Sequence, residues 1–344
     1  MNEQYLWDRR GEPDHEVVEL EQLLAPMRMT ERRPDFAQIT RLSPGQNRFA
    51  RWKRWAVPMA VATSAIIASA LWITFRPHFQ PGVWEAESAT GTPELAGKAF
   101  TGGRIEAGAW LSTDGTSSIH LRTTIGEMEI QPGSQLSLAE SRAHRQRFVM
   151  RYGSIHARIS APPGLFVVDT PSARAVDLGC EYTLRVEHDG SGELTVSAGW
   201  VQLQHSWMQS LVPAGNAAKI SPDGTLTPPY FQDATPEFKE AVTKLSLDSQ
   251  LDPETRGSVI ETILREVRKR DAFTLLNLFT RTNTEERVKI FDQLNQFVPA
   301  PPGITRETAR NWQVSSMDAW WPVVEKAVGL SEIKKGKKTL RDLD

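Results

Sequence analysis

The chain has 344 residues, of which 40 are basic and 42 acidic, giving a formal net charge of -2 at pH 7. This near balance offers no electrostatic basis for nucleic-acid binding, and the length predicts two or three domains. The single cysteine excludes an internal disulfide framework, and the seven histidines show no zinc-ligand spacing. We therefore expect no metal and no other cofactor.

The first segment, residues 1–54, is polar and too short to hold an enzyme. Asp14 can cap a helix that ends near Pro26. One face of this helix is aliphatic, through Val17, Leu20 and Leu24. We expect this face, together with Trp7, to bind a partner protein. The alternative is that the aliphatic side chains pack only on Tyr5, Leu6 and Trp7.

Residues 55–75, from Trp55 to Phe75, form an apolar run without a charged residue. A helix of about 20 residues spans a bilayer, so the run predicts a transmembrane helix. Basic residues crowd the preceding segment, whereas only Arg76 follows before Lys98, which places the N-terminus in the cytoplasm. A buried core helix would show a polar stripe, and a cleaved signal peptide would not follow some fifty polar residues. We thus expect a single-pass inner-membrane protein whose C-terminal part is periplasmic.

Residues 76–101 are rich in Pro, Gly and Thr, which is typical of a linker. In residues 102–230, short segments alternate between apolar and polar side chains, at 119–121, 128–130, 136–138, 155–159 and 182–186. Gly-containing turns such as Asp189-Gly190 and Asp223-Gly224 separate such segments. The absence of a helical period there excludes a parallel βαβ sheet. An all-β sandwich, barrel or solenoid remains.

From Thr235 the period becomes helical, with Thr235 as a cap and Pro236 at the first helical position. We predict an α-helical C-terminal region at 235–330, followed by a basic tail at 331–344. Apolar residues recur at helical spacing in two further stretches, Ile260 to Val267 and Val288 to Val298. These helices could form a separate bundle or pack against the β domain.

The β region contains, in order, the segments WLSTD at 110–114, IQPGSQLSL at 130–138, RYGSIHARI at 151–159, FVVDTP at 166–171, DLGCEYTLRV at 177–186 and SAGWVQL at 197–203. Together these six segments resemble the FecR domain of transmembrane sensors that regulate extracytoplasmic-function sigma factors. The resemblance covers roughly residues 102–213. It implies a membrane-anchored, all-β FecR-like domain, followed here by the α-helical region. It also implies an anti-sigma role, with a sigma factor as the cytoplasmic partner.

Three features depart from the family pattern. Cys180 stands where the family usually has Thr, and we expect it to be a buried, inert thiol. The cytoplasmic segment is shorter than in the iron-transport regulators. The region after Thr235 is helical, whereas iron-transport members carry a module there that engages an outer-membrane transducer. Coupling to a TonB-dependent receptor is therefore not expected.

Three function classes follow from these patterns. The first is a signal transducer whose periplasmic domain senses or binds a partner while the cytoplasmic helix holds a sigma factor. The second is an anchored periplasmic scaffold or binding protein without a cytoplasmic partner. In that case exposed tryptophans could contact an envelope protein or a glycan, the candidates being Trp200, Trp207, Trp312, Trp320 and Trp321.

The third class, an enzyme, has the least support in the sequence. No G-x-S-x-G elbow, H-E-x-x-H helix or phosphate-binding loop is present. Pairs such as His156 with Asp169, or Glu127 with Glu129, are ordinary strand residues unless they prove adjacent. We expect Glu127 and Glu129 to lie on a solvent face opposite Met128.

Overall fold

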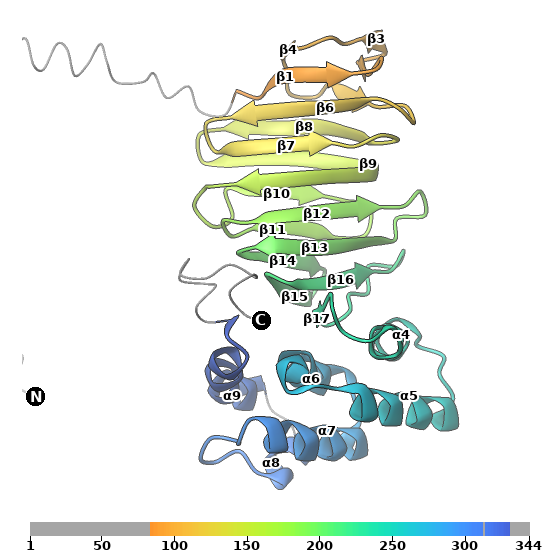
Figure 1. Cartoon of the computed structure of the whole chain (residues 1–344), viewed down its shortest axis with the longest axis vertical. Coiled ribbons are helices and arrows are strands. Elements are labelled where there is room, and N and C mark those ends of the chain that lie inside the picture. The colour runs from red at the N-terminus through yellow and green to blue at the C-terminus, as the bar shows by residue number, and fades with distance from the viewer. Residues whose placement is uncertain (1–82, 312–313, 331–344) are drawn as a thin grey trace, which may run out of the picture. The chain divides into compact units, whose positions relative to one another are not determined.

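The computed structural model of the protein describes residues 83–311 and 314–330 (Figure 1). The chain divides into two compact units, Met1–Arg76 and Pro77–Asp344, and every described residue belongs to the second. The predicted cytoplasmic helix, the apolar run at 55–75 and the basic tail lie outside the described residues. Within 83–311 and 314–330, no helix is long and apolar enough to cross a membrane.

The strands of the described residues form two facing sheets. Sheet A runs in the order β4 (Gly103–Arg104), β1 (Glu85–Thr90), β6 (Ser118–Thr123), β7 (Gly126–Ile130), β9 (Arg145–Ile159), β12 (Glu181–Val186), β13 (Gly192–Ala198), β16 (Asn216–Ile220) and β17 (Tyr230–Phe231). Sheet B runs in the order β3 (Lys98–Ala99), β2 (Glu94–Leu95), β5 (Trp110–Ser112), β8 (Gln135–Arg142), β9, β10 (Phe166–Asp169), β11 (Arg174–Asp177), β14 (Trp200–His205) and β15 (Met208–Pro213). All these pairings are antiparallel except that of β9 with β10.

Strand β9 belongs to both sheets. Its first half pairs with β8 and β10 in sheet B, and its second half pairs with β7 and β12 in sheet A. The chain changes sheets at Gly153, where φ is +105° and an added Cβ would lie 2.3 Å from the Cα of Ser134. Only glycine fits this conformation and this close approach. The two sheets are thus joined through one continuous strand.

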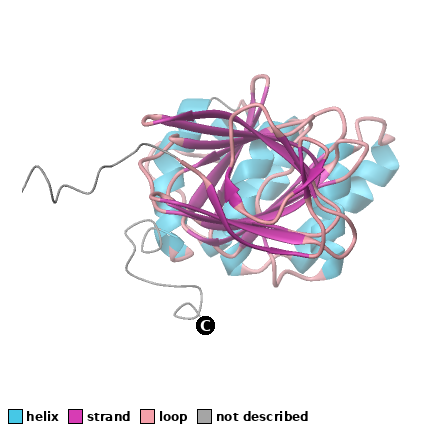
Figure 2. Cartoon of the chain, turned by 90° about the horizontal axis from the view of Figure 1, so that it is seen from above, coloured by secondary structure: helices cyan, strands magenta, loops and turns pink. Residues whose placement is uncertain are grey.

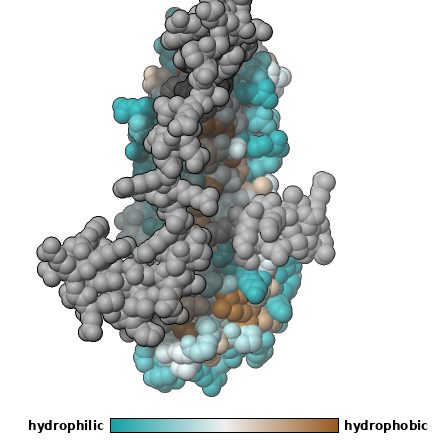
Figure 3. Space-filling model, turned by 90° about the vertical axis from the view of Figure 1, so that its left-hand side faces the viewer, coloured by the Kyte–Doolittle hydropathy of each residue, from teal (hydrophilic) through white to brown (hydrophobic). Residues whose placement is uncertain are grey.

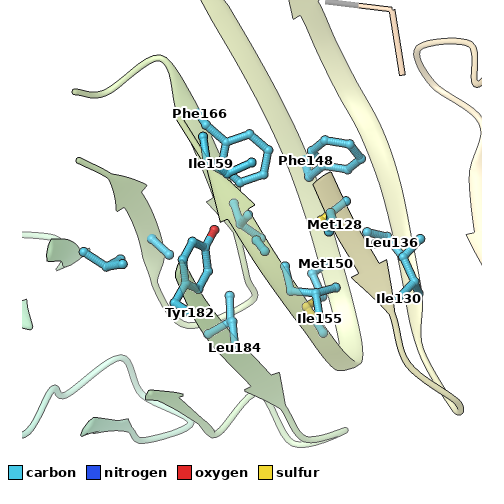
Figure 4. Packing of buried hydrophobic residues seen from close by; sticks show 14 of the residues in the cluster. Met128, Ile130, Leu136, Phe148, Met150, Ile155, Ile159, Phe166, Tyr182 and Leu184 are labelled. Carbon is cyan, nitrogen blue, oxygen red and sulfur yellow. The ribbon is translucent and has the colours of Figure 1, made fainter. Parts of the chain in front are cut away.

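Between the two facing sheets (Figure 2) lies a hydrophobic core to which both contribute (Figure 4). Phe148 and Phe166 come from sheet B, and their rings lie 5.8 Å apart. Trp84 packs edge-on against Phe148 at 5.1 Å, and its indole N–H donates to Gln146. Alternate residues of each strand point inward, so the apolar residues of the alternating segments form the core of a sandwich.

The predicted alternating segments are confirmed as parts of β6, β7, β8, β9 and β12. The sandwich begins earlier than expected, however, because β1, β2 and β3 lie within residues 76–101, which the sequence marked as a linker. The stretch Glu85–Thr90 buries only Ala86, so it shows no apolar alternation. This stretch is a strand because it pairs with β6, and such a long-range pairing cannot be predicted from the local sequence.

The C-terminal region of the structure is helical, as predicted. Its helices are α4 (Pro236–Leu247), α5 (Pro253–Glu266), α6 (Ala272–Leu278), α7 (Thr284–Phe297), α8 (Arg306–Arg310) and α9 (Val314–Ala327), with 3₁₀ turns at Lys269–Asp271 and Phe279–Arg281. The hydroxyl of Thr235 caps α4 by accepting from the backbone N–H of Phe238, and Pro236 opens the helix.

These helices share a second core with the last strands of the sandwich. Trp200 of β14 meets Phe273 of α6 edge-on at 6.1 Å. The buried hydroxyl of Thr274 donates to the backbone carbonyl of Pro229 at 2.8 Å. The helices therefore pack against the β domain and are not a separate bundle. On the face shown in Figure 3, hydrophilic residues cover the flanks and hydrophobic ones gather towards the lower, helical end.

Candidate functional site

The predicted partner-binding residues of the N-terminal segment, Trp7, Val17, Leu20 and Leu24, lie outside the described residues. Their role stays a prediction. Within the described ranges, no group of His, Cys, Asp and Glu side chains is arranged to hold a metal ion. The candidate site described below therefore lies on the surface of the β sandwich.

The tryptophans predicted as candidate contact residues differ widely in solvent exposure. Trp200 and Trp320 are buried, and Trp321 packs against Phe273 with ring centroids 4.8 Å apart. Trp312 lies outside the described residues. Trp207, in contrast, is 83% exposed. Among the large hydrophobic side chains of the described residues, only Val323, at 38%, is also classed as exposed.

Trp207 sits at the tip of a tight hairpin. Strands β14 and β15 pair along their full length up to His205 opposite Met208, so Ser206 and Trp207 alone form the turn. Ser206 has φ of +52°, a left-handed conformation that costs a non-glycine residue about 1–2 kcal/mol. Glycine is the usual residue at such a position. Such strain is characteristic of functional sites, and here it adjoins the most exposed tryptophan of the described residues.

The base of this hairpin is held by the rest of the molecule. The sulfur of Met208 accepts from the backbone N–H of Leu226 at 3.2 Å, and the guanidinium of Arg281 approaches it at 3.8 Å. Burial lowers the pKa of Arg281 to about 10. The hairpin is thus anchored both to the sandwich and to the 3₁₀ turn that follows α6. It presents Trp207 on a fixed support.

Beside the hairpin turn lies a pocket of about 310 Å³, lined by residues 169–174 and 204–206. Strands β11 and β14 bring these two stretches together, because Arg174 pairs in register with Gln204. The lining offers one carboxylate, one guanidinium, hydroxyls, an amide and an imidazole. We define this pocket and the adjoining Trp207 as the hairpin site.

Asp169 is the best-held side chain of the hairpin site. Arg147 and Arg174 each donate to its carboxylate at 2.5 Å, from β9 and β11. Burial opposes ionisation, but the hydrogen bonds from Arg174 and Arg147 outweigh it and lower the pKa of Asp169. The same hydrogen bond raises the pKa of Arg174. Both side chains are therefore charged and oriented before any ligand arrives.

Neighbouring turns pack tightly against the hairpin site. Ser172 donates to the carbonyl of Pro222 at 2.8 Å. A Cβ added at Gly190 would lie 2.7 Å from the Ser172 hydroxyl, and one added at Gly224 would lie 2.3 Å from the His205 ring. The turns after β10, β12 and β16 and the β14–β15 tip thus converge into one surface, which we call the loop face. The β12–β13 loop of this face projects on the right of Figure 1.

Two further hollows adjoin the β12–β13 turn of the loop face. One, of about 340 Å³, lies against the β7–β8 turn, and the other, of about 590 Å³, lies against Lys219 and Pro222. Both are lined in part by Arg185 and Glu187. Because connecting loops on a rigid scaffold commonly carry binding function, the loop face is the candidate functional surface.

The outer face of sheet A has a different character. Arg122 pairs with Glu87 at 2.6 Å, while Arg158 pairs with Glu127 at 3.2 Å and with Glu181 at 3.1 Å. Such exposed pairs typically contribute only about 0–1 kcal/mol each. The expectation of a solvent face at Glu127 and Glu129 is confirmed, since Met128 between them is fully buried.

The pairing of His156 with Asp169, which would be needed for a catalytic dyad, is not seen. His156 lies in sheet A, 3.2 Å from Glu181 and 3.2 Å from the Thr183 hydroxyl. Asp169 lies in sheet B and is occupied by the two arginines. The hairpin site was only partly visible in the sequence, which singled out Trp207 and Asp169 but did not bring them together with residues 170–174 and 204–206.

One buried acid lies between the sheets. Asp177 is 1% exposed and accepts from the Cys180 thiol and from the backbone N–H of Gly179. Burial raises the pKa of Asp177 to about 6. Burial, with the adjacent Asp177, also raises the pKa of Cys180, so the expectation of a buried, unreactive thiol is confirmed.

No protein-family model matches the chain, and no curated protein matches it. Two solved chains, both candidate anti-sigma factors of Parabacteroides distasonis, show a partial structural likeness. The first is 14% identical with a TM-score of 0.31, over 34% of this chain and 57% of that one. The second is 16% identical with a TM-score of 0.31, over 46% of this chain and 73% of that one. The match to the first spans less than two thirds of its length.

Proposed function

We propose that the chain is a membrane-anchored sensor whose β sandwich binds a ligand through the loop face. The observation that carries the proposal is the hairpin site, where an exposed tryptophan on an anchored turn directly follows Ser206, which lines a pre-oriented polar pocket. Preorganised groups bind at a lower entropic cost than mobile ones. The proposal assigns binding, and no reaction, to this surface.

The proposal extends to topology and partner. The apolar run at 55–75 anchors the chain in a bacterial inner membrane, with the N-terminus cytoplasmic and the described residues periplasmic. The helix bearing Val17, Leu20 and Leu24 then holds a sigma factor. Two sequence features support this: the asymmetry of basic residues around the run, and the ordered FecR-like segments, which all fall on strands or turns of one sandwich.

The test uses the full chain in its native membrane. Crosslinking followed by purification should recover a sigma factor with the wild-type protein. A variant with Val17→Ala, Leu20→Ala and Leu24→Ala should lose it, because the aliphatic face that fills a groove is gone. Val323→Ala, which alters an exposed side chain outside the hairpin site, serves as the control and should recover as much sigma factor as the wild type. Equal recovery by the triple variant would contradict the assigned contact.

A second candidate function is an anchored periplasmic binding protein with no cytoplasmic partner. It is favoured by the fact that the hairpin site is complete within the unit Pro77–Asp344. Removing the first forty residues separates the two functions. A binding protein would keep its activity in the cell, whereas a sigma-factor regulator would lose it.

A further inference from the structure

We propose that the hairpin site binds a carbohydrate, specifically a β-linked glycan chain of uncharged hexose units. This inference deepens the proposed function and rests on it, since that function places the site outside the cytoplasm. It starts from a contrast between Trp207 and its surroundings. The indole is almost fully exposed, yet no other side chain near the turn is an exposed large hydrophobic residue.

A protein partner would require a different surface. The centre of a protein interface is a contiguous apolar patch in which aromatic anchors are surrounded by further apolar contacts. Among the described residues Trp207 has no such surround, because the other exposed large hydrophobic residue there, Val323, lies on α9. A single indole surrounded by polar groups is complementary to a ligand that has one small apolar face and polar groups around its edge.

A pyranose ring with equatorial substituents has this character. Its axial C–H bonds form an apolar face that stacks on an aromatic ring, and its hydroxyls both donate and accept hydrogen bonds at the rim. The polar pocket supplies both kinds of partner. Asp169 accepts, Arg174 donates and Gln204 can do both, while Ser172, whose O–H donates to Pro222, can accept. The volume of about 310 Å³ is at the small end of ligand sites and suits one sugar unit of a chain.

The charges of the pocket argue against an ionic ligand. Asp169 and Arg174 are the only Asp, Glu, Lys or Arg residues in its lining, and they are bonded to each other at 2.5 Å. Arg147, which is not part of the lining, also donates to Asp169 at 2.5 Å, so a cation would meet two guanidinium groups. An anion would lie beside the Asp169 carboxylate and compete with it for these guanidinium groups. Neutral hydroxyls can bond to the remaining lone pairs and N–H groups of the pair without breaking it.

The site is also rigid. Asp169 is fixed by two arginines, Ser172 is bonded to Pro222, and the His205 ring rests against Gly224. The indole is carried by a turn of only two residues. A weakly interacting ligand such as a sugar gains most from preorganised partners, since little ordering entropy is lost on binding.

The test is isothermal titration calorimetry of the purified full chain in detergent, with the N-acetylglucosamine tetrasaccharide and with cellotetraose as probes. The wild type should bind at least one of them. Trp207→Ala should weaken that binding by about tenfold or more, whereas Trp207→Phe should keep most of it because an aromatic face remains. Val323→Ala removes the other exposed hydrophobic side chain and should bind as the wild type does.

Two results would overturn the inference. One is the absence of binding to both saccharides by the wild type, which would leave a protein partner as the occupant of the hairpin site. The other is equal affinity of Trp207→Ala and the wild type. Neither result affects the capture of a sigma factor by the N-terminal segment, so failure here is distinguishable from failure of the proposed function.

Discussion

The core between the two sheets and the core around the helices differ in where their side chains come from. The first is filled by residues of the sandwich alone, such as Phe148 and Phe166. The second takes Trp200, Tyr230 and Phe231 from the last strands and packs helices against them. The helices therefore complete the end of the sandwich, and the comparison predicts that neither part unfolds independently of the other.

The largest expected effect on stability comes from removing a large side chain from the core that the helices share with the last strands. Phe273 is fully buried between Trp200 and Trp321, so Phe273→Ala should lower the free energy of unfolding by about 3–5 kcal/mol. Phe148→Ala, a matched cavity in the sandwich core, should lower it similarly. In thermal unfolding both variants should shift one common transition. If the helices of Phe273→Ala unfolded in a separate transition, the claim that the two parts unfold together would be wrong.

The second prediction uses the buried acids of the two cores. In the helical part, Arg268 donates to the buried Asp271 at 2.8 Å, whereas Asp177 in the sandwich has only the Cys180 thiol and a backbone N–H as donors. With the pKa of Asp177 raised from 3.8 to about 6, the protonated form is favoured in the folded state. The contribution of Asp177 to stability should therefore be fully present below pH 4 and fall by about 3 kcal/mol as the pH rises from 4 through 6.

Asp177→Asn should remove this part of the pH dependence, because the amide stays neutral. The measurement is denaturant unfolding between pH 4 and 7, compared with the wild type. Glu129→Gln alters an exposed carboxylate and should leave the profile unchanged. A wild-type profile that the Asn variant reproduces would show that folding does not raise the pKa of Asp177.

A smaller effect is expected at the hydrogen bond that joins the two parts. Thr274→Val keeps the shape of the side chain but removes the donor to the Pro229 carbonyl, which should cost about 1–2 kcal/mol. Thr280→Val, at an exposed position of the same region, should cost less than about 0.5 kcal/mol. Equal costs in chemical denaturation would mean that the Thr274 bond does not stabilise the junction.

Much of the fold could be predicted because local pattern and tertiary environment agree. The segment 182–186 alternates and becomes β12, with Tyr182 and Leu184 in the core. The Thr235-Pro236 cap marks the start of α4. Strands β1–β3 were not predicted because their sequences show no apolar alternation, and they are strands only through their pairing with other strands. Helix α6 lies within the predicted helical region 235–330, but its bounds could not be predicted because AFTLLNL is buried on nearly every side and so shows no period.

The candidate site was harder to predict than the fold. Trp207 could be named as a contact residue, but five tryptophans were equal candidates until burial separated them. The pocket depends on the pairing of Arg174 with Gln204, which lie far apart in the chain. The change of sheet at Gly153, which fixes the two-sheet arrangement, is likewise a tertiary contact that periodicity does not encode.

The central claim is that the loop face, and not the flat face of either sheet, binds the ligand. Hydrogen exchange of the full chain with and without saturating saccharide tests this directly, because bound ligand slows local opening. We predict added protection at residues 169–174 and 204–207, with no change along β6 in sheet A. Protection confined to the sheet A strands, or unchanged exchange throughout the loop face, would contradict the account.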